Sequence, residues 1–243
     1  MSGAARYGGF VPAQILLPNH TTCMSQYSFR PVTQFSVFPP VIKNLLIING
    51  LIFMAQLVYD QVLISWFGLW PLGSPYVNAH FWPWQLVTYG FLHGDMMHIL
   101  FNMFALWMFG VQIEKTWGSK RFSIYYFACL IGAGLIQLIV ATLAVKNGSI
   151  YPTIGASGGV FGILLAFGML FPNQIIMLIF PPIPMKAKYF VIIFGGLELF
   201  FAVSGTQAGV ANFAHLGGML FGFLLIMYWR GKLPIQPERP MRS

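Results

Sequence analysis

The sequence predicts an all-α membrane protein: a bundle of six transmembrane helices with a short central fourth helix. Of the 243 residues, 57% are hydrophobic and only 7% are charged, whereas soluble domains carry about 25% charged residues. The apolar residues form six runs near the length that crosses a bilayer, about 20 residues. Lysine and arginine lie almost entirely on one side of these runs, as the loops of membrane proteins require.

The six runs lie at 41–59, 96–113, 121–145, 157–171, 187–203 and 213–229. The fourth is too short to span the membrane alone. From Ser157 to Phe171 a helix covers about 22 Å, whereas the hydrocarbon core is about 30 Å thick. We therefore expect the preceding NGSIYPTIGA to enter the membrane as non-helical chain. Such chain is tolerated only where it is packed in protein or lines a water-filled cavity.

Charge placement predicts the orientation. Of the 13 lysines and arginines, 12 lie on the side that holds both termini, and only Lys146 lies on the other. The positive-inside rule then places both termini in the cytoplasm. The 12 residues are Arg6, Arg30, Lys43, Lys115, Lys120, Arg121, Lys186, Lys188, Arg230, Lys232, Arg239 and Arg242. The net charge of +8 thus follows the topology, and it indicates no nucleic-acid partner.

The chain divides into three predicted segments. We expect an N-terminal cytoplasmic tail at 1–40, a membrane domain at 41–230 and a basic cytoplasmic tail at 231–243. The first segment has no long apolar core after a basic start, so we expect no cleaved signal peptide. Cys23 and Cys129 lie far apart and indicate neither a disulfide framework nor a metal site. We expect no cofactor.

Three polar residues begin the spans that run from outside to inside. His98, Ser157 and His215 are therefore expected at similar depth, although 117 positions separate the first from the last. Polar and ionisable residues within spans are costly and usually functional. A single intramembrane histidine could instead form an interhelical hydrogen bond. Polar residues at the starts of three spans that run in the same direction favour one shared site.

Ser157 lies in IGASGGVFG, which allows three interpretations. Its small residues suit close helix packing, and its G-x-S-x-G spacing matches the nucleophile turn of soluble hydrolases. The composition argues against the soluble turn. The third interpretation is a nucleophile inside the membrane. If these glycines pack against Gly218 and Gly222 of the sixth span, Ser157 would reach His215, which would act as general base and then general acid.

The same pattern predicts groups that would support this pair. His98 and Asn102 are spaced i, i+4 and share one helix face, so both could donate to an oxyanion beside the backbone N–H of Ser157. Structural hydrogen bonds are the alternative role for His98 and Asn102. Phe161, one turn below Ser157, could support the imidazole of His215.

Two carboxylates, Glu198 and Glu114, each allow more than one role. The chain order Ser157, Glu198, His215 imitates a serine–acid–histidine triad. Glu198 could equally be a protonated or hydrogen-bonded packing residue, and it is left out of the predicted catalytic set. Glu114 and Arg121 flank the turn after the second span, where we expect a structural ion pair.

HGDMMHILFN, EKTWGSKRF, GASGGVFG and AHLGGMLFG, in this order and spacing, resemble the rhomboid intramembrane serine proteases over about residues 41–230. The resemblance implies a basic six-helix, bacterial-type form, located in the inner membrane if the source is bacterial. It implies a Ser157/His215 dyad, an oxyanion site of His98, Asn102 and the Ser157 amide, and transmembrane protein substrates. Many members carry Trp-Arg in the first loop, whereas here residues 60–95 contain four tryptophans and no arginine.

These features predict a serine endopeptidase that hydrolyses peptide bonds in or near transmembrane segments through an acyl-enzyme on Ser157. The first alternative is a non-catalytic rhomboid-like protein that binds or escorts membrane proteins. The second is a transporter that uses His98, His215 and Glu198 as a proton relay. The sequence shows no repeated halves, which weakens the transporter interpretation.

Overall fold

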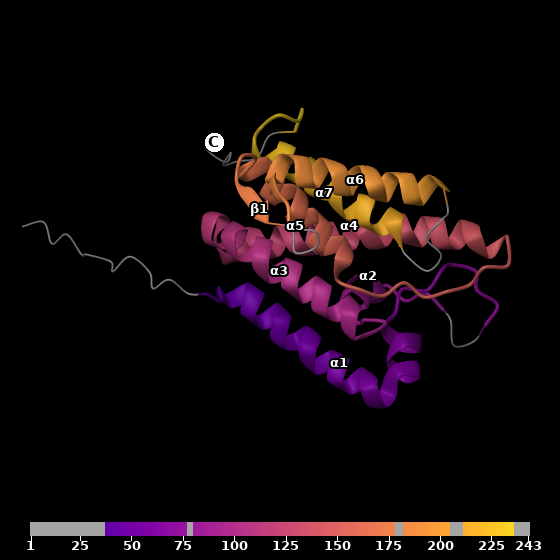
Figure 1. Cartoon of the computed structure of the whole chain (residues 1–243). Coiled ribbons are helices and arrows are strands. Elements are labelled where there is room, and N and C mark those ends of the chain that lie inside the picture. The colour runs from indigo at the N-terminus through magenta and orange to yellow at the C-terminus, as the bar shows by residue number, and fades with distance from the viewer. Residues whose placement is uncertain (1–36, 77–79, 178–181, 205–210, 236–243) are drawn as a thin grey trace, which may run out of the picture. The chain divides into compact units, whose positions relative to one another are not determined.

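The computed structural model describes residues 37–76, 80–177, 182–204 and 211–235 (Figure 1). Residues 1–36 of the first predicted tail and 236–243 of the second therefore lie outside the described residues. Seven helices, a 3-10 turn and two short strands occur within them. They are α1 (Pro40–Phe67), α2 (Gln85–Thr88), η1 (Tyr89–Phe91), α3 (Met96–Trp117), α4 (Ser119–Val145), α5 (Ser157–Leu170), β1 (Ile175–Met177), β2 (Pro184–Lys186), α6 (Ala187–Ser204) and α7 (Asn212–Trp229).

Helices α1, α3, α4, α6 and α7 are each long and apolar enough to cross a membrane, and α5 is a shorter apolar helix. The chain is an integral multi-pass membrane protein, and the predicted all-α bundle with a short fourth span is confirmed. The long helices alternate in direction. The start of α1, the turn between α3 and α4, the start of α6 and the end of α7 consequently share one end of the bundle (Figure 1).

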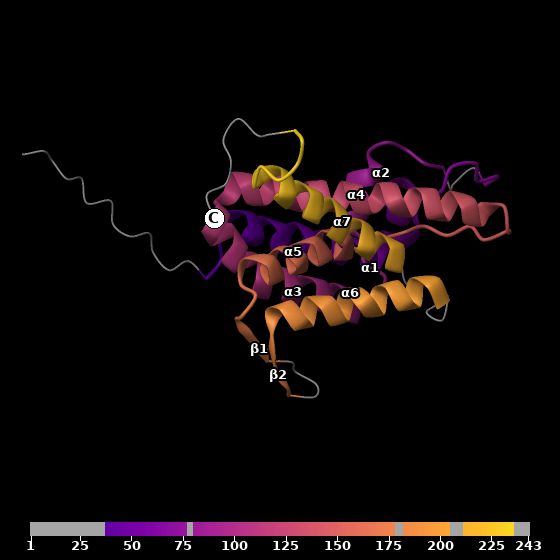
Figure 2. The ribbon, with the colours of Figure 1, turned by 90° about the horizontal axis from the view of Figure 1, so that it is seen from above.

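The short helix α5 is central, because it packs against α3, α4, α6 and α7. Figure 2 shows it between the α4–α7 pair and the α3–α6 pair. Its glycines allow this closeness. A Cβ atom on Gly159 would lie 2.6 Å from the Tyr126 ring, and one on Gly158 would overlap Ala133 of α4. Larger side chains here would force the helices apart.

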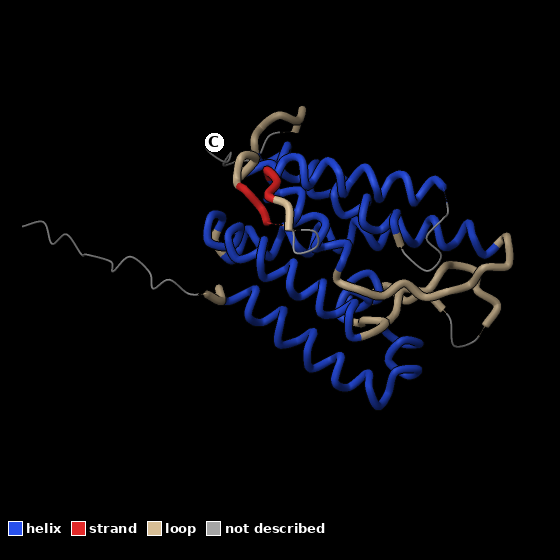
Figure 3. The backbone as a smooth tube through the Cα atoms, viewed as in Figure 1, coloured by secondary structure: helices blue, strands red, loops and turns tan. Residues whose placement is uncertain are grey.

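The segment between α4 and α5 is non-helical, as predicted, and its backbone is paired within the protein. It runs back from the far end of α4 toward the start of α5 (Figure 3). Thr153 exchanges two backbone hydrogen bonds with Leu69, of 3.0 and 2.9 Å, and the N–H of Gly155 donates to the carbonyl of Tyr89. These bonds satisfy the N–H and carbonyl of Thr153 and the N–H of Gly155, which non-helical chain would otherwise leave without a partner in the membrane.

The structure differs from the sequence predictions at two places, in the first helix and between the spans α5 and α6. The first helix continues to Phe67 through a kink at Tyr59 instead of ending at residue 59. A two-stranded antiparallel hairpin pairs Ile175 with Lys186 between α5 and α6. No alternating pattern of apolar residues predicted this hairpin, because each strand is only three residues long.

The predicted ion pair between Glu114 and Arg121 is wrong. Glu114 is buried and accepts hydrogen bonds from the N–H groups of Val41 and Ile42, at 3.0 and 2.9 Å. The first amides of a helix have no intrahelical partner, so this carboxylate caps α1 from a distant part of the chain. The Arg121 guanidinium instead lies over the Trp229 ring, 5.9 Å from its centroid.

Candidate active site

A cavity of about 1280 Å³ brings the predicted polar residues together. Its polar lining residues lie near the starts of α3, α5 and α7, and its lining extends to Ile176 and Met177 of β1. The starts of these three helices lie at the end of the bundle opposite the turn between α3 and α4 (Figure 1). His98, Asn102, Ser157, Phe161 and His215 all line it. Three helices that are distant in the sequence, α3, α5 and α7, therefore contribute polar residues to one cavity.

Ser157 is the first residue of α5. The amides of a first helical turn lack intrahelical acceptors, and the first such bond in α5 runs from Val160 N–H to the Ala156 carbonyl. The unpaired amides and the helix dipole make this end electropositive. A negative charge that develops on an atom beside Ser157 would be stabilised there.

His215 faces the Ser157 hydroxyl directly. The distance from its Nε2 to Ser157 Oγ is 2.8 Å, which is a hydrogen bond. The imidazole stacks on Phe161, with ring centroids 4.3 Å apart and planes at 8°. The predicted contact between glycine faces positions this pair, because a Cβ atom on Gly218 of α7 would overlap the backbone of Gly158 in α5.

Hydrogen bonds at the start of α3 orient His98. Asp95 caps α3 by accepting from the N–H of His98 at 2.8 Å. The N–H of Gly94 donates to His98 Nδ1 at 3.2 Å. A neutral imidazole that accepts at Nδ1 carries its proton on Nε2. His98 therefore presents an Nε2–H donor.

Gly155 lets that donor approach Ser157. Its φ is +127°, a conformation that side-chain-bearing residues rarely adopt. A Cβ atom at this position would lie 2.7 Å from His98 Nε2 and 3.6 Å from Ser157 Oγ. The space beside Gly155 thus holds both the imidazole donor and the hydroxyl.

Asn102 is buried on the same face of α3, one turn beyond His98. Its Nδ2 donates to the His98 carbonyl at 2.9 Å. Because an amide nitrogen carries two hydrogens, this bond leaves one for a ligand in the cavity. The two α3 residues and the Ser157 amide supply the donor types that an oxyanion needs.

Glu198, which is not among the predicted site residues, lies against His215. Its Oε2 is 2.9 Å from His215 Nδ1, although the ring N–H is not aligned for a regular hydrogen bond. Asn212 donates to the same Oε2 at 2.7 Å. The chain order of serine, acid and histidine was the one signal in the sequence that pointed to this contact.

His93 lies beside the site without entering it. The ring is 1% exposed, packs edge-on against His98, and has no hydrogen-bond partner at either nitrogen among the described residues. Its backbone N–H donates to Gln56 of α1 at 2.9 Å. Burial, together with the neighbouring His98, lowers the pKa of His93 to about 4.

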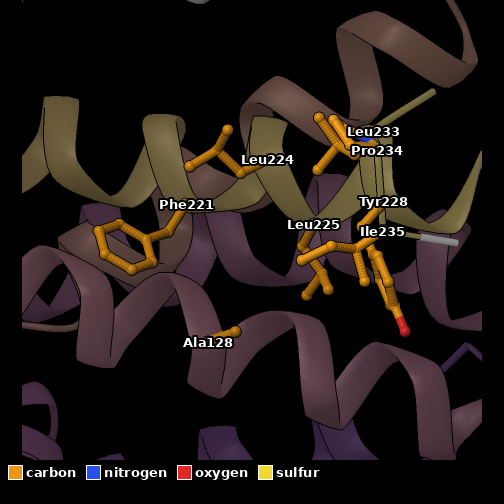
Figure 4. Close-up of a pocket in the computed structure, with 8 residues that line it drawn as sticks. All are labelled: Ala128, Phe221, Leu224, Leu225, Tyr228, Leu233, Pro234 and Ile235. Carbon is orange, nitrogen blue, oxygen red and sulfur yellow. The ribbon is translucent and has the colours of Figure 1, made fainter. Parts of the chain in front are cut away.

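A second pocket, shown in Figure 4, lies between α4 and the end of α7. Its lining is apolar apart from Tyr228, so it offers no set of groups for catalysis. Across the described ranges, no group of three or more His, Cys, Asp or Glu side chains could hold a metal ion.

The chain is similar to known proteins of one family. A family model described as the rhomboid domain matches residues 80–232. "Rhomboid protein 1, mitochondrial" of Saccharomyces cerevisiae is 29% identical over 90% of this chain and 63% of its own length. Rhomboid protease GluP of Bacillus subtilis is 33% identical over 58% of this chain and 25% of its own length.

Rhomboid protease GlpG of Photorhabdus laumondii is 27% identical over 78% of this chain and 61% of its own length. The chain thus spans less than two thirds of each of these three relatives.

Proposed function

The chain belongs to the rhomboid family, and from this we propose that it is an intramembrane serine endopeptidase. The observation that carries the proposal is the 2.8 Å contact between His215 Nε2 and Ser157 Oγ inside a cavity. A serine hydroxyl is a weak nucleophile until a base accepts its proton. The two proteases among the relatives support the same reaction class.

In the acylation step, Ser157 Oγ attacks the carbonyl carbon of the scissile bond while its proton passes to His215 Nε2. The carbonyl oxygen becomes an oxyanion. Collapse of this intermediate breaks the C–N bond, and the proton on Nε2 passes to the leaving amine. The product is an ester between Ser157 and the N-terminal part of the substrate.

The oxyanion would be held by three donors. These are the Ser157 N–H at the electropositive start of α5, the Nε2–H of His98 and the amide of Asn102. Loss of one such donor in an acyl-transfer enzyme costs about 10²–10³ in kcat. Water then attacks the ester with His215 as base, and Ser157 is regenerated with its proton.

The shape and lining of the cavity favour a transmembrane segment as substrate. Beyond the polar residues, the cavity continues along an apolar wall from α3, α5 and α6, formed by Phe104, Met108, Leu164, Phe190 and Phe194. An apolar peptide would bury its side chains there, at roughly 25 cal/mol per Å² removed from water. Cleavage in or near membrane-spanning segments follows.

We also propose that both termini face the cytoplasm. Four segments that carry lysine or arginine, which are the start of α1, the turn between α3 and α4, the start of α6 and the end of α7, share one end of the bundle. The site would then open on the opposite side of the membrane, near the level of Lys146. If the chain is bacterial, the membrane is the inner one. Attachment of a membrane-impermeant label to a cysteine introduced at Lys146, and not at Lys232, in sealed cells would support this orientation.

A non-catalytic protein that binds and escorts membrane proteins is the alternative. Purified protein in liposomes, offered a panel of single-span model substrates, distinguishes the two. We expect the wild type to cut at least one substrate, and Ser157→Ala and His215→Ala to cut none while remaining folded. Ser123→Ala is the matched control, because Ser123 donates to its own helix at Ser119 and lies outside the cavity.

A panel that binds equally to the wild type and to Ser157→Ala, with no cleavage by either, would support the escort protein. Cleavage by Ser157→Ala at the wild-type rate would refute the assigned nucleophile.

A further inference from the structure

A carboxylate lies behind the proposed catalytic histidine. Glu198 of α6 places Oε2 2.9 Å from His215 Nδ1, and the side chains of His215 and Glu198 are only 11% and 14% exposed. The same oxygen accepts from Asn212 Nδ2 at 2.7 Å. A carboxylate oxygen has the lone pairs to face both donors, and the low exposure limits screening of this contact by water.

The contact at Nδ1 affects Nε2, the nitrogen on the opposite side of the imidazole that faces Ser157. Nε2 can accept the Ser157 proton only if the ring's own proton is on Nδ1, and a neutral imidazole can adopt either tautomer. Phe161 fixes the plane of the ring but not its proton. Although the ring N–H is not aligned on Oε2, a carboxylate 2.9 Å from Nδ1 favours the tautomer with its proton on Nδ1, which leaves Nε2 free to act as base.

Charge changes during the reaction give the contact a second effect. When the Ser157 proton reaches Nε2, His215 becomes an imidazolium. A negative charge 2.9 Å from Nδ1 stabilises that cation, and the stabilisation is larger where little water enters.

We propose that Glu198 is a positioning residue that holds His215 in the base-competent tautomer and stabilises its imidazolium. The inference rests on the proposed protease function. In each proton transfer the Nδ1 proton stays on His215, Glu198 remains a carboxylate, and the Ser157 proton alone moves to Nε2 and on to the leaving group. Glu198 belongs to α6 and His215 to α7, so this contact joins the two helices.

Two substitutions separate the acceptor from its charge. Glu198→Gln keeps a neutral acceptor of the same shape for His215 and Asn212 but removes the charge. Glu198→Leu removes the acceptor as well. We expect kcat to fall about 10-fold in Glu198→Gln and about 10²-fold in Glu198→Leu, with KM within about twofold of the wild type; in-line acid partners of catalytic histidines have larger effects, up to about 10⁴.

The matched control loosens the same two helices without touching His215. Met219 of α7 lies against α6, where its Cε would be 3.1 Å from a Cβ atom on Gly195. It is one turn along α7 from His215. Met219→Ala therefore weakens the α6–α7 contact while leaving the contact between Glu198 and His215 in place.

The rate of reaction with a small fluorophosphonate provides a readout that would not change if Glu198 had only a structural role. The probe phosphonylates an activated serine directly: the Oγ–P bond forms, fluoride leaves, and His215 takes the proton. No substrate helix has to bind in the cavity. We expect its second-order rate constant to fall in parallel with kcat in both Glu198 variants and to stay at the wild-type value in Met219→Ala.

Wild-type phosphonylation rates in both Glu198 variants, with slower cleavage of single-span substrates in Glu198→Leu and Met219→Ala, would overturn the proposal. Glu198 would then only hold α6 against α7. If Glu198→Leu does not fold, the isosteric Glu198→Gln decides by the same comparison. Failure of the protease function itself looks different, because Ser157→Ala would then react with the probe as fast as the wild type.

Discussion

Gly218→Ala should separate the two halves of the catalytic pair without altering either side chain. The Cβ atom of an alanine at 218 would overlap the carbonyl oxygen of Gly158 and lie 2.8 Å from its carbonyl carbon and 3.2 Å from its Cα. All three atoms are backbone, so no side chain can turn away. Gly158 follows Ser157 directly, and His215 lies one turn before Gly218.

The size of the effect follows from these distances. Non-bonded carbon atoms prefer separations of about 3.5–4.0 Å, so α5 and α7 must move apart by about 1 Å. The 2.8 Å distance from Ser157 Oγ to His215 Nε2 would then exceed hydrogen-bond range. A misplacement of about 1 Å costs on the order of 10²-fold in rate, and overpacking costs about 1–3 kcal/mol of stability.

Cleavage of a single-span substrate in liposomes and the thermal midpoint in detergent measure the two effects. Gly196→Ala is the matched control, because a Cβ atom there meets nothing within 4 Å. We expect the control to keep wild-type activity and Gly218→Ala to lose about 99% of it. Full activity in Gly218→Ala, with an unchanged midpoint, would refute the argument that glycine packing sets the catalytic distance.

The remaining predictions concern the oxyanion site and the loop before α3. Gly155→Ala should lower kcat by about 10²-fold with little change in KM, because its Cβ would displace His98 Nε2; unchanged kcat would mean that His98 does not act from this position. Asn102→Ala should lower kcat about 10²–10³-fold at constant KM, and a change confined to KM would assign Asn102 to ground-state binding instead. His93 has a pKa lowered to about 4 by burial and by His98, so the unfolded chain takes up its proton first as the pH falls below about 6.5. The resulting loss of about 1–3 kcal/mol between pH 6.5 and 4 should shrink in His93→Phe, as thermal midpoints at pH 7 and 4.5 would show; an identical pH dependence in both proteins would exclude His93 as its cause.

The positions of the spans could be predicted because hydropathy and length are local properties of the chain. The shortness of α5 could be predicted from the short run between Ser157 and Phe171, and the non-helical chain before it from the missing length. The approach of Ser157 to His215 could be predicted because glycines recur four apart in both helices, which limits how the helices can pack.

Contacts that depend on the rotation of one helix against another could not be predicted in this way. Glu198 reaches His215 because α6 turns that face toward α7, and no glycine register or period in the sequence fixes this rotation. Glu114 and Arg121 flank the same turn in the sequence, which favours an ion pair between them. The buried amides of α1 compete for the same carboxylate, and nothing local in the sequence places them beside it.

The most direct test of the central claim is to map the adduct of a fluorophosphonate on the purified protein by peptide mass spectrometry. The account predicts a single phosphonylated site at Ser157 in the wild type, a labelling rate lower by at least about 10²-fold in His215→Ala, and no adduct in Ser157→Ala. Labelling of His215→Ala at the wild-type rate, or an adduct on another serine with Ser157 unmodified, would contradict it.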